Sequence, residues 1–346
     1  MELKDKIKRL TNAYGVSGDE RREISPIAAE LMKPYVDKVE IDEFGNVIGY
    51  KKCGVKNAPK LLLAAHIDQI GFVITEITDE GFLRFAPIGG VDSRMLLGSE
   101  LTVLTQKGPI TGVVSSVPPH LQKPGDSSKS VKIQDMTLDI GMTGAQARRA
   151  VRVGDYAAFA HDTIDLLGDR VCGKAMDDRA CFVCVLHALE LLKDAPLAMD
   201  IIAVGTTKEE VGAHGAGSVT YRYRPEYAIA IDVGHARTPD VSPDRVPCEL
   251  GKGPMIAIGS NSRPNFARRV MEIARAKEIP YQLEVCPSST GTDAMKMQIV
   301  ESGCCTLVIS LPLKYMHSPV EVLSMSDVKN VGRLLAELAK SFDGRL

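Results

Sequence analysis

The chain has 346 residues, of which 45% are hydrophobic and 25% charged, and it contains no tryptophan. This length supports a packed core in one large domain or two smaller ones. Its 42 basic and 44 acidic side chains leave a formal charge of −2, so no basic surface points to nucleic acid and no disordered tail is indicated.

The apolar runs and the cysteines exclude a membrane protein and favour a reduced compartment. The longest apolar runs, such as residues 61–65 and 229–231, fall far short of the roughly 20 residues that a membrane-spanning helix needs. The N-terminus, MELKDKIKRL, lacks the apolar core of a secretory signal. Cys181 and Cys184 share one face of a predicted helix, where free cysteine behaves as a small hydrophobe. We therefore expect a cytoplasmic protein.

The first 70 residues predict helices followed by strands. Residues 3–31 have helical spacing, interrupted by a Gly-Val-Ser-Gly segment at residues 15–18. A pair of strands is expected at residues 38–42 and 47–51. Residues 60–67, KLLLAAHI, form a continuous apolar run, which is typical of a strand that is buried on both faces.

The pattern changes between residues 70 and 160. Short β-type runs alternate there with Gly, Pro and Asp turns: GFVITEI, GFLRFAPI, ELTVLT, ITGVVSSV and YAAFA. Helical periodicity is confined to a stretch near residues 143–150. Several short strands at regular spacing predict a small all-β barrel or sandwich.

Helices and strands alternate again from residue 170 onward. Helices are expected at residues 180–193, 265–277 and 326–341, and strands at residues 199–205, 227–233 and 306–310. This alternation predicts an α/β fold with a mostly parallel sheet and helices on both faces. We therefore divide the chain into a discontinuous α/β domain, residues 1–69 and 163–346, and a β-rich insert, residues 70–162.

Side chains that bind metals follow several of the predicted strands. Because ligands of open α/β sheets bind beyond the carboxyl ends of the strands, these side chains can converge in one crevice. A turn that leads into the helix after residue 179 can deliver a further carboxylate from the side. The residues concerned are His66, Asp68, Asp177, Glu209, Glu210, Asp232 and His317.

This combination of side chains indicates a pair of divalent metals. Two imidazoles with three or four carboxylates suit zinc, cobalt or manganese, whereas calcium prefers oxygen ligands alone. They are too many for a single catalytic zinc, which usually takes three protein ligands. Two metals about 3.5–4 Å apart that share a carboxylate account for the surplus. A lone aspartate at a strand end more often caps a turn. The prediction of a metal site therefore depends on all these residues occurring together at strand ends.

Other catalytic arrangements match less well. Residues 215–218, GAGS, do not form the G-x-S-x-G of a nucleophilic serine. Residues 251–254 lack the spacing of a phosphate-binding loop, and no cysteine has the context of a Cys-His pair. His214 and His235 closely follow candidate ligands and are expected at most to line the cleft.

Five motifs together resemble one known family. They are HxD after a buried strand, GKxxDDR, TxxEEVG, IDVG and YxHSPxE, and they occur in this order along nearly the whole chain. They resemble the M42 metallo-aminopeptidases, the TET-type glutamyl, leucyl and lysyl aminopeptidases. The resemblance implies a zinc-exopeptidase α/β domain interrupted by a β-rich dimerisation domain, in agreement with the change of pattern described above.

The resemblance also implies how two divalent metals are held. Asp177 corresponds to the carboxylate that bridges them. His66 and Asp232 would complete one metal site, and Glu210 and His317 the other. Zinc or cobalt is expected, with manganese as a further candidate.

The resemblance also implies roles for two further carboxylates. Glu209 corresponds to the general base that takes the proton of a water bridging the metals and passes it to the leaving amine. Asp68 corresponds to the carboxylate that fixes the tautomer and basicity of His66. If Glu209 and Glu210 are adjacent on a strand, they point to opposite sides, so one can bind metal while the other faces the substrate. Gln69 departs from the HxDE that many relatives have, which affects no proposed ligand.

The resemblance further implies exopeptidase action on short peptides, with the free amine bound at the second metal. It also implies homodimers that build a hollow tetrahedron of twelve subunits. The preferred first residue stays open, because acidic, neutral and basic residues are all served within the family. The substrate pocket is expected near residues 251–259 and 288–293.

Two alternative functions remain. Relatives of this family have been labelled endoglucanases, but a glycosidase needs an acid and a base in a site lined by polar and aromatic groups. Here histidines accompany the carboxylates, aromatic residues make up 5% of the chain and tryptophan is absent. A non-catalytic scaffold that retains the fold is expected to lack Glu209 or some metal ligands, and none of these residues is missing.

Overall fold

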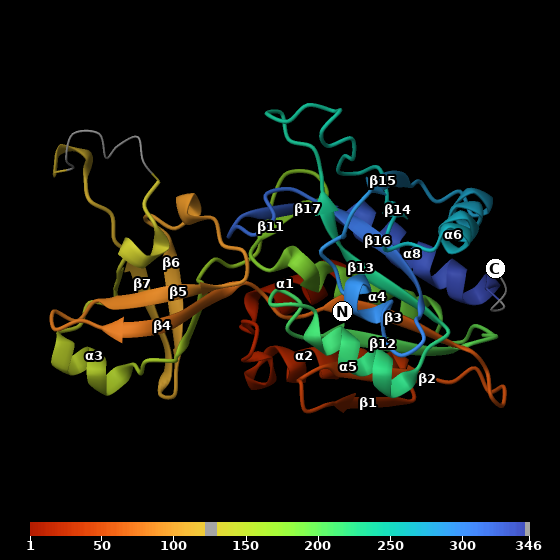
Figure 1. Cartoon of the computed structure of the whole chain (residues 1–346), viewed down its shortest axis with the longest axis horizontal. Coiled ribbons are helices and arrows are strands. Elements are labelled where there is room, and N and C mark those ends of the chain that lie inside the picture. Colours follow the sequence, from red (N-terminus) through yellow and green to blue (C-terminus); the bar gives the residue numbers. More distant parts are fainter. Residues whose placement is uncertain (122–129, 343–346) are drawn as a thin grey trace.

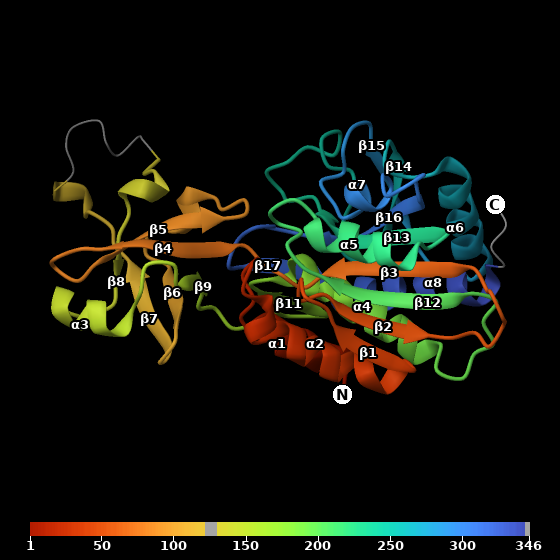
Figure 2. The same ribbon diagram turned by 60° about the horizontal axis from the view of Figure 1, so that its bottom comes forward.

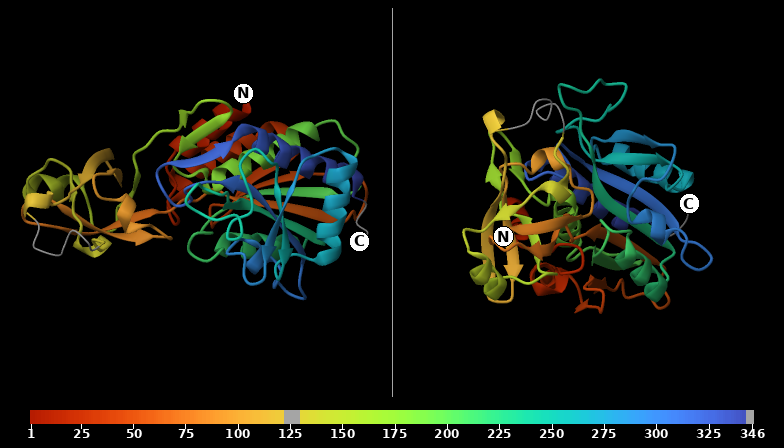
Figure 3. Two further views of the ribbon diagram at one scale, coloured as in Figure 1. Left: turned by 90° about the horizontal axis from the view of Figure 1, so that it is seen from above. Right: turned by 60° about the vertical axis from the view of Figure 1, so that its left-hand side comes forward.

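The computed structural model describes residues 1–121 and 130–342. The chain forms two parts that lie side by side (Figure 1). One is an eight-stranded sheet with helices on its faces, which we call the α/β body, and the other is a closed barrel. The chain begins in the α/β body, passes through the barrel and returns (Figure 3).

The large sheet is parallel at its centre. Neighbouring strands β12, β3, β13 and β16 run in the same direction, whereas β2 and β14 are antiparallel to their neighbours β12 and β16. In spatial order, the strands are β1 (Lys38–Ile41), β2 (Val47–Lys51), β12 (Asp200–Thr206), β3 (Lys60–His66), β13 (Tyr227–His235), β16 (Cys305–Leu313), β14 (Met255–Gly259) and β15 (Gln282–Cys286).

Helices cover both faces of this sheet (Figure 2). One face packs against α1 (Leu3–Asn12), α2 (Ile24–Met32), α4 (Met176–Leu191), α6 (Pro264–Ala276) and α8 (Met325–Ser341). The other face packs against α5 (His214–Tyr223) and α7 (Ala294–Met297). Across residues 1–121 and 130–342, no helix combines the length and the apolar character that spanning a membrane requires.

The alternation of side chains along β3 explains why both faces are buried. Leu61 and Leu63 join the core beneath α4, and Leu62 and Ala64 join the smaller core beneath α5. Successive strand residues point to opposite faces, so a strand covered on both sides is apolar throughout. The sequence KLLLAAHI meets that requirement.

The barrel has an apolar core of its own. The rings of Phe72 and Phe85 lie 5.2 Å apart, and those of Phe72 and Phe159 lie 5.6 Å apart, both edge to face. Its strands close in the order β4 (Gly71–Ile77), β5 (Leu83–Ile88), β8 (Leu138–Asp139), β7 (Gly108–Val114), β6 (Glu100–Thr105) and β9 (Tyr156–Phe159), and helix α3 (Gly144–Ala150) packs against it.

Smaller elements complete the fold. A three-stranded sheet consists of β10 (Ile164–Asp165), β11 (Arg170–Gly173) and β17 (Glu321–Ser324). Short 3-10 helices are η1 (Glu20–Arg22), η2 (Lys33–Tyr35), η3 (Ser93–Met95), η4 (Pro119–Leu121) and η6 (Ile133–Asp135).

Side chains of the N-terminal segment attach the barrel to the α/β body. The guanidinium of Arg22 donates hydrogen bonds to the carbonyl oxygens of Leu104 (2.7 Å) and Thr105 (2.5 Å). The hydroxyl of Tyr14 donates one to Thr102 Oγ1 at 3.1 Å. The rim of the barrel therefore has a defined position beside the carboxyl ends of the parallel strands.

The structure confirms the predicted fold class and each predicted helix and strand, with small shifts at their ends. The β-rich segment is a barrel and not a sandwich. The sequence pattern did not predict β14, β15, α5 and α7, nor the small sheet of β10, β11 and β17. Helix α5 contains Gly, Ser, Thr and Tyr, which favour helix weakly. The division at residues 70 and 162 stays a prediction, and residues 122–129 and 343–346 of the predicted domains lie outside the described residues.

Candidate active site

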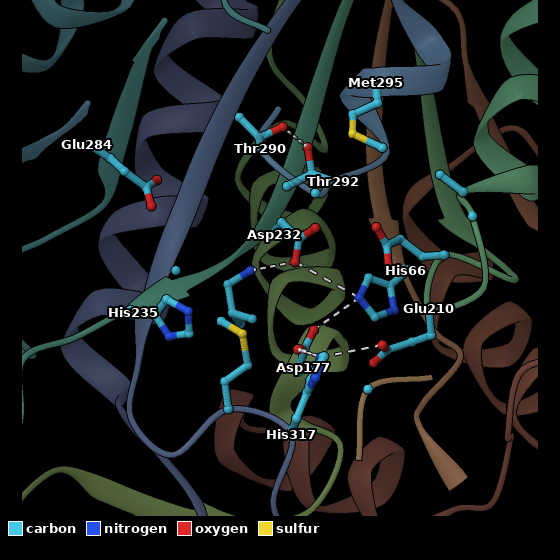
Figure 4. A pocket seen from close by; sticks show the side chains of 18 residues that line it. His66, Asp177, Glu210, Asp232, His235, Glu284, Thr290, Thr292, Met295 and His317 are labelled. Carbon is cyan, nitrogen blue, oxygen red and sulfur yellow. Dashed lines mark hydrogen bonds and ion pairs between the residues drawn. The ribbon is translucent and has the colours of Figure 1, made fainter. Parts of the chain in front are cut away.

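A pocket of about 470 Å³ opens near the carboxyl ends of β3, β12 and β13 (Figure 4). Most of its lining comes from the α/β body, and the barrel contributes Gly90. The six proposed residues in its lining are His66, Asp177, Glu209, Glu210, Asp232 and His317. The seventh, Asp68, is fully buried behind them.

Asp177 lies between the two histidines. Its Oδ1 is 3.0 Å from His66 Nε2, and its Oδ2 is 3.2 Å from His317 Nε2. The residue belongs to the first turn of α4, where its backbone angles are not helical, and its peptide bond to Asp178 is cis. One carboxylate thus presents each of its oxygens to a different imidazole, which is the arrangement expected of a bridging ligand.

The other carboxylates lie beside one histidine each. Glu210 Oε2 is 3.3 Å from His317 Nε2, and Asp232 Oδ1 is 3.9 Å from His66 Nε2. By these distances His66 has Asp232 beside it, and His317 has Glu210 beside it. Ligand atoms of Glu210 and His66 also lie within 4.8 Å of one another. The division into two metal sites that the resemblance implies therefore stays a prediction.

Asp68 connects the two halves of the site from behind. It accepts hydrogen bonds from Ser17 Oγ (2.6 Å) and from the backbone N–H groups of Glu209 (3.1 Å) and Glu210 (3.3 Å). Its Oδ1 lies 3.6 Å from His66 Nδ1. A single buried carboxylate thus fixes the backbone that carries both glutamates and lies beside the ring of His66.

Hydrogen bonding controls the charges of the central group. Burial alone would raise the pKa of Asp177 and lower that of His66. The hydrogen bonds of Asp177 with the two imidazoles, and those of His66 with Asp177 and Asp68, outweigh burial. The pKa of Asp177 is therefore held below its usual value and that of His66 above it. The hydrogen bond to Asp177 also raises the pKa of His317 to about 9.

Burial and mutual repulsion act on the remaining carboxyls. Burial raises the pKa of Glu209 to about 10, and burial with the nearby charge of Asp177 raises the pKa of Glu210 to about 8. Burial also raises the pKa of Asp232, although His66 works in the opposite direction. Too many acidic groups are crowded together here for all of them to be charged without a compensating cation.

The donor set fits divalent cations. Nitrogen and oxygen atoms of His66, Asp177 and Glu210 lie within 4.8 Å of one another, as do those of His66, Asp178 and Asp232. Imidazole with carboxylate suits zinc, cobalt or manganese. A cation at each position would stabilise the charged carboxylates and remove their mutual repulsion.

Loops, and not strand ends, carry three of the proposed residues. Strand β12 ends at Thr206, so Glu209 and Glu210 lie beyond it, after Lys208 with φ +57°. The strand alternation expected to separate the two glutamates therefore does not apply, and the loop conformation separates them instead. His317 likewise follows the end of β16, with φ +61°.

The structure also places residues that the sequence analysis missed. Asp178 is fully buried, and its Oδ2 accepts a hydrogen bond from the backbone N–H of His66 at 3.2 Å. The pairing of two aspartates in GKAMDDR is the signal that marks it. Glu284 on β15 and Met295 on α7 line the pocket as well. In QLEVC, Glu284 occupies the central position of a strand too short to stand out by its alternation.

The structure also shows which of the segments expected near the substrate pocket line it. Residues 290–292 line it, whereas residues 251–259 contribute nothing to the lining. His235 lines the pocket, but His214 begins α5 with an exposed side chain and is not part of the lining. Cys181 and Cys184 are buried in the core, as expected.

Comparisons with known proteins identify the family. A sequence model of the family described as M42 glutamyl aminopeptidase matches residues 45–334. The lysyl aminopeptidase of Pyrococcus furiosus is 36% identical over 335 residues, which cover 96% of this chain and 95% of that protein.

Solved structures similar to this chain include further aminopeptidases. An aminopeptidase from the archaeon Desulfurococcus kamchatkensis superimposes with a TM-score of 0.91 at 38% identity, over 98% of this chain and 94% of that one. The TET1 peptidase of Pyrococcus horikoshii, described as assembling into a tetrahedron or a large octahedral shell, has a TM-score of 0.86 at 34% identity, over 99% of this chain and 100% of that one.

Proposed function

The chain belongs to the M42 family of aminopeptidases, and we propose that it removes single residues from the free N-termini of short peptides with the help of two divalent cations. The observation that carries this proposal is the position of Asp177 between two imidazoles, each accompanied by a further carboxylate. The family membership supports a peptidase, and the geometry of this cluster supports its dependence on metal.

The two halves of the cluster would each hold one cation. His66 and Asp232 would bind the first, Glu210 and His317 the second, and Asp177 both. Cations bound there would polarise the scissile carbonyl and make an attacking water more acidic. Zinc, cobalt and manganese all suit these ligands.

Glu209 would act as the general base. It lines the same pocket, and no ion pair with either imidazole joins it to the ligand cluster among the described residues. Its carboxylate would accept the proton that the attacking water releases and deliver it to the leaving amine. Asp68 holds the backbone of Glu209 in place and is therefore a positioning residue.

The size of the pocket agrees with removal of one residue at a time. A volume of about 470 Å³ lies in the range of small-ligand sites. Acidic groups line it, and they favour a positively charged free N-terminus over a blocked one. Gly90 of the barrel is part of the lining, so the barrel helps to shape the site.

We further propose that the barrel is the dimerisation domain, and that the dimers build a larger hollow assembly. The similarity to the TET1 peptidase, which assembles into a tetrahedron, supports this proposal. A barrel with its own core can serve as a separate contact module. The domain boundaries proposed here are residues 70–162 for the barrel and residues 1–69 and 163–346 for the catalytic domain.

The function is tested with peptides that differ only at the N-terminus. The metal-loaded protein should release the first residue from a free tripeptide and leave its N-acetylated counterpart intact, and a chelator should abolish the activity. Carboxymethylcellulose serves as the second substrate. Hydrolysis of the cellulose, or peptide cleavage that survives complete metal removal, would contradict the proposal.

A further inference from the structure

Glu284 places a carboxyl group in the pocket apart from the proposed ligands. It lies on β15, the edge strand of the sheet, in register with Ala257 on β14. Residues in register point to the same face, and the small side chain of Ala257 leaves room for the longer one to cross β14. Beyond β14, on the neighbouring strand β16, Ser310 Oγ donates a hydrogen bond to Glu284 Oε2 at 2.8 Å.

The register of the strands fixes where this carboxyl group ends. Ser310 pairs with Asp232 on β13, and a Cβ added at Gly234 would lie 3.1 Å from Glu284 Oε1. The carboxyl group therefore covers β13 close to Gly234, two residues beyond Asp232 on the same face. Two residues along a strand span about 7 Å. Figure 4 shows the carboxyl group turned into the pocket, on the side of Asp232 and His235.

Glu284 has no cation to balance it among the described residues. Its carboxyl group accepts a hydrogen bond from the neutral hydroxyl of Ser310. Burial raises the pKa of Glu284, and the hydrogen bond from Ser310 opposes this effect. Cations held by the ligand cluster would offset the charges of the cluster's own carboxylates, but Glu284 belongs to a different part of the wall. A half-buried carboxyl group without a cationic partner is suited to bind a cation from outside.

The rest of the wall suits a long aliphatic chain that ends in a charge. Met295 and Val233 contribute apolar surface, and Thr290 and Thr292 are small and polar. Lysine and arginine bury their methylene stems on apolar surface and bring their charged ends to an acceptor. A first residue with such a side chain would reach Glu284 while its own carbonyl lay at the ligand cluster.

We propose that Glu284 is the specificity-determining residue of this enzyme, and that it selects peptides whose first residue is lysine or arginine and rejects those that begin with an acidic residue. The inference rests on the proposed aminopeptidase function. Relatives are described both as glutamyl and as lysyl aminopeptidases, and the charge of Glu284 favours the basic class for this chain.

The decisive experiment compares Glu284→Gln with the unchanged protein. Glutamine keeps the shape and can still accept the hydrogen bond from Ser310, so the variant removes only the charge. Glu272→Gln, on the exposed surface of α6 and outside the pocket, is the matched control. The probes are the p-nitroanilides of lysine, arginine, leucine and glutamate, with zinc, cobalt or manganese added, and kcat/KM is measured for each. Metal content and thermal midpoint confirm that the variants are folded.

The unchanged protein should cleave the lysine and arginine substrates best and the glutamate substrate worst. Glu284→Gln should lower kcat/KM for lysine and arginine roughly 10- to 100-fold, as expected for the loss of a charged hydrogen bond, and leave leucine within about threefold. The control should match the unchanged protein. Free lysine should inhibit the unchanged protein more strongly than free leucine, and this difference should vanish in Glu284→Gln.

Two outcomes overturn the inference, and they can be told apart. If leucine or glutamate is preferred, or if Glu284→Gln changes all four substrates equally, the specificity role is wrong while the aminopeptidase function stands. If none of the four substrates is cleaved with any of the three metals, the proposed function itself is wrong, and the inference is wrong with it.

Discussion

The barrel and the α/β body bury different kinds of side chain. Within the described part of the barrel, the buried polar residues are Thr102 and Thr105, which are neutral. The α/β body buries charged groups such as Asp68, Asp177 and Asp232, all within reach of one pocket. Burying a carboxylate is unfavourable unless a partner compensates its charge. The contrast indicates that one region is built for packing and the other to hold a ligand.

The two regions meet at the pocket, where their contributions also differ. The α/β body supplies the side chains that carry chemistry, and the barrel supplies the backbone of Gly90. A Cβ added at Gly90 would lie 2.9 Å from His317 Nδ1, so the absence of a side chain there permits close contact. The barrel thus shapes a site whose reactive groups it does not provide.

The largest expected effect concerns the two neighbouring glutamates of the α/β body. Because Glu209 is the proposed general base and not a ligand, Glu209→Gln should lower turnover about 10³-fold or more while both metals stay bound. Glu210→Gln should instead weaken one metal site and recover part of its activity when excess metal is added. Turnover and metal content, measured by mass spectrometry on the same samples, separate the two roles. Loss of a metal from Glu209→Gln, or near-normal rates with both metals present, would contradict these assignments.

A second prediction tests whether the two cores are independent. Phe72 is fully buried in the barrel, and Phe266 is fully buried in the α/β body. Each Phe→Ala change should cost about 3–5 kcal/mol in the region concerned. Phe72→Ala should destabilise the barrel and its assembly while the metal content is kept, whereas Phe266→Ala should reduce metal binding.

Calorimetry, light scattering and metal analysis of both variants provide the measurements. Equal loss of metal from the two variants would show that the regions do not behave as separate units.

The smallest predicted effect lies at the junction of the two regions. Gly90→Ala should push the barrel loop away from His317 and lower kcat/KM about tenfold, because small displacements in a catalytic site are costly. Gly217→Ala is the matched control, since its added Cβ would meet only Lys296 Cβ at 3.6 Å. Stopped assays of the two variants at equal metal loading give the comparison. Normal activity of Gly90→Ala would show that the barrel does not shape the site.

The sequence predicted those parts of the fold whose pattern is set by local burial. The run KLLLAAHI is apolar on both faces, and the short β runs before residue 160 alternate with clear turns. The resemblance of the motifs to the M42 family, now confirmed by the comparisons, supplied the grouping of His66, Asp177 and the other candidate ligands.

Features that depend on tertiary contacts were not predicted. The loop that carries Glu209 and Glu210 is held by Asp68 and by Glu20, whose Oε1 accepts a hydrogen bond from the backbone N–H of Lys208 at 3.1 Å. Glu284 reaches the pocket only because β15 lies beside β14 and Ala257 is small. Such contacts join residues far apart in the chain, so the local pattern of the sequence does not predict them.

The central claim is that one carboxylate, Asp177, bridges two divalent cations. Crystals of the protein soaked with zinc or cobalt and measured at the absorption edge of that metal test it most directly. We predict two anomalous peaks about 3.5–4 Å apart, with one Asp177 oxygen directed at each, one peak beside His66 and Asp232 and the other beside Glu210 and His317. A single peak, or a pair of peaks held by other residues, would contradict the account.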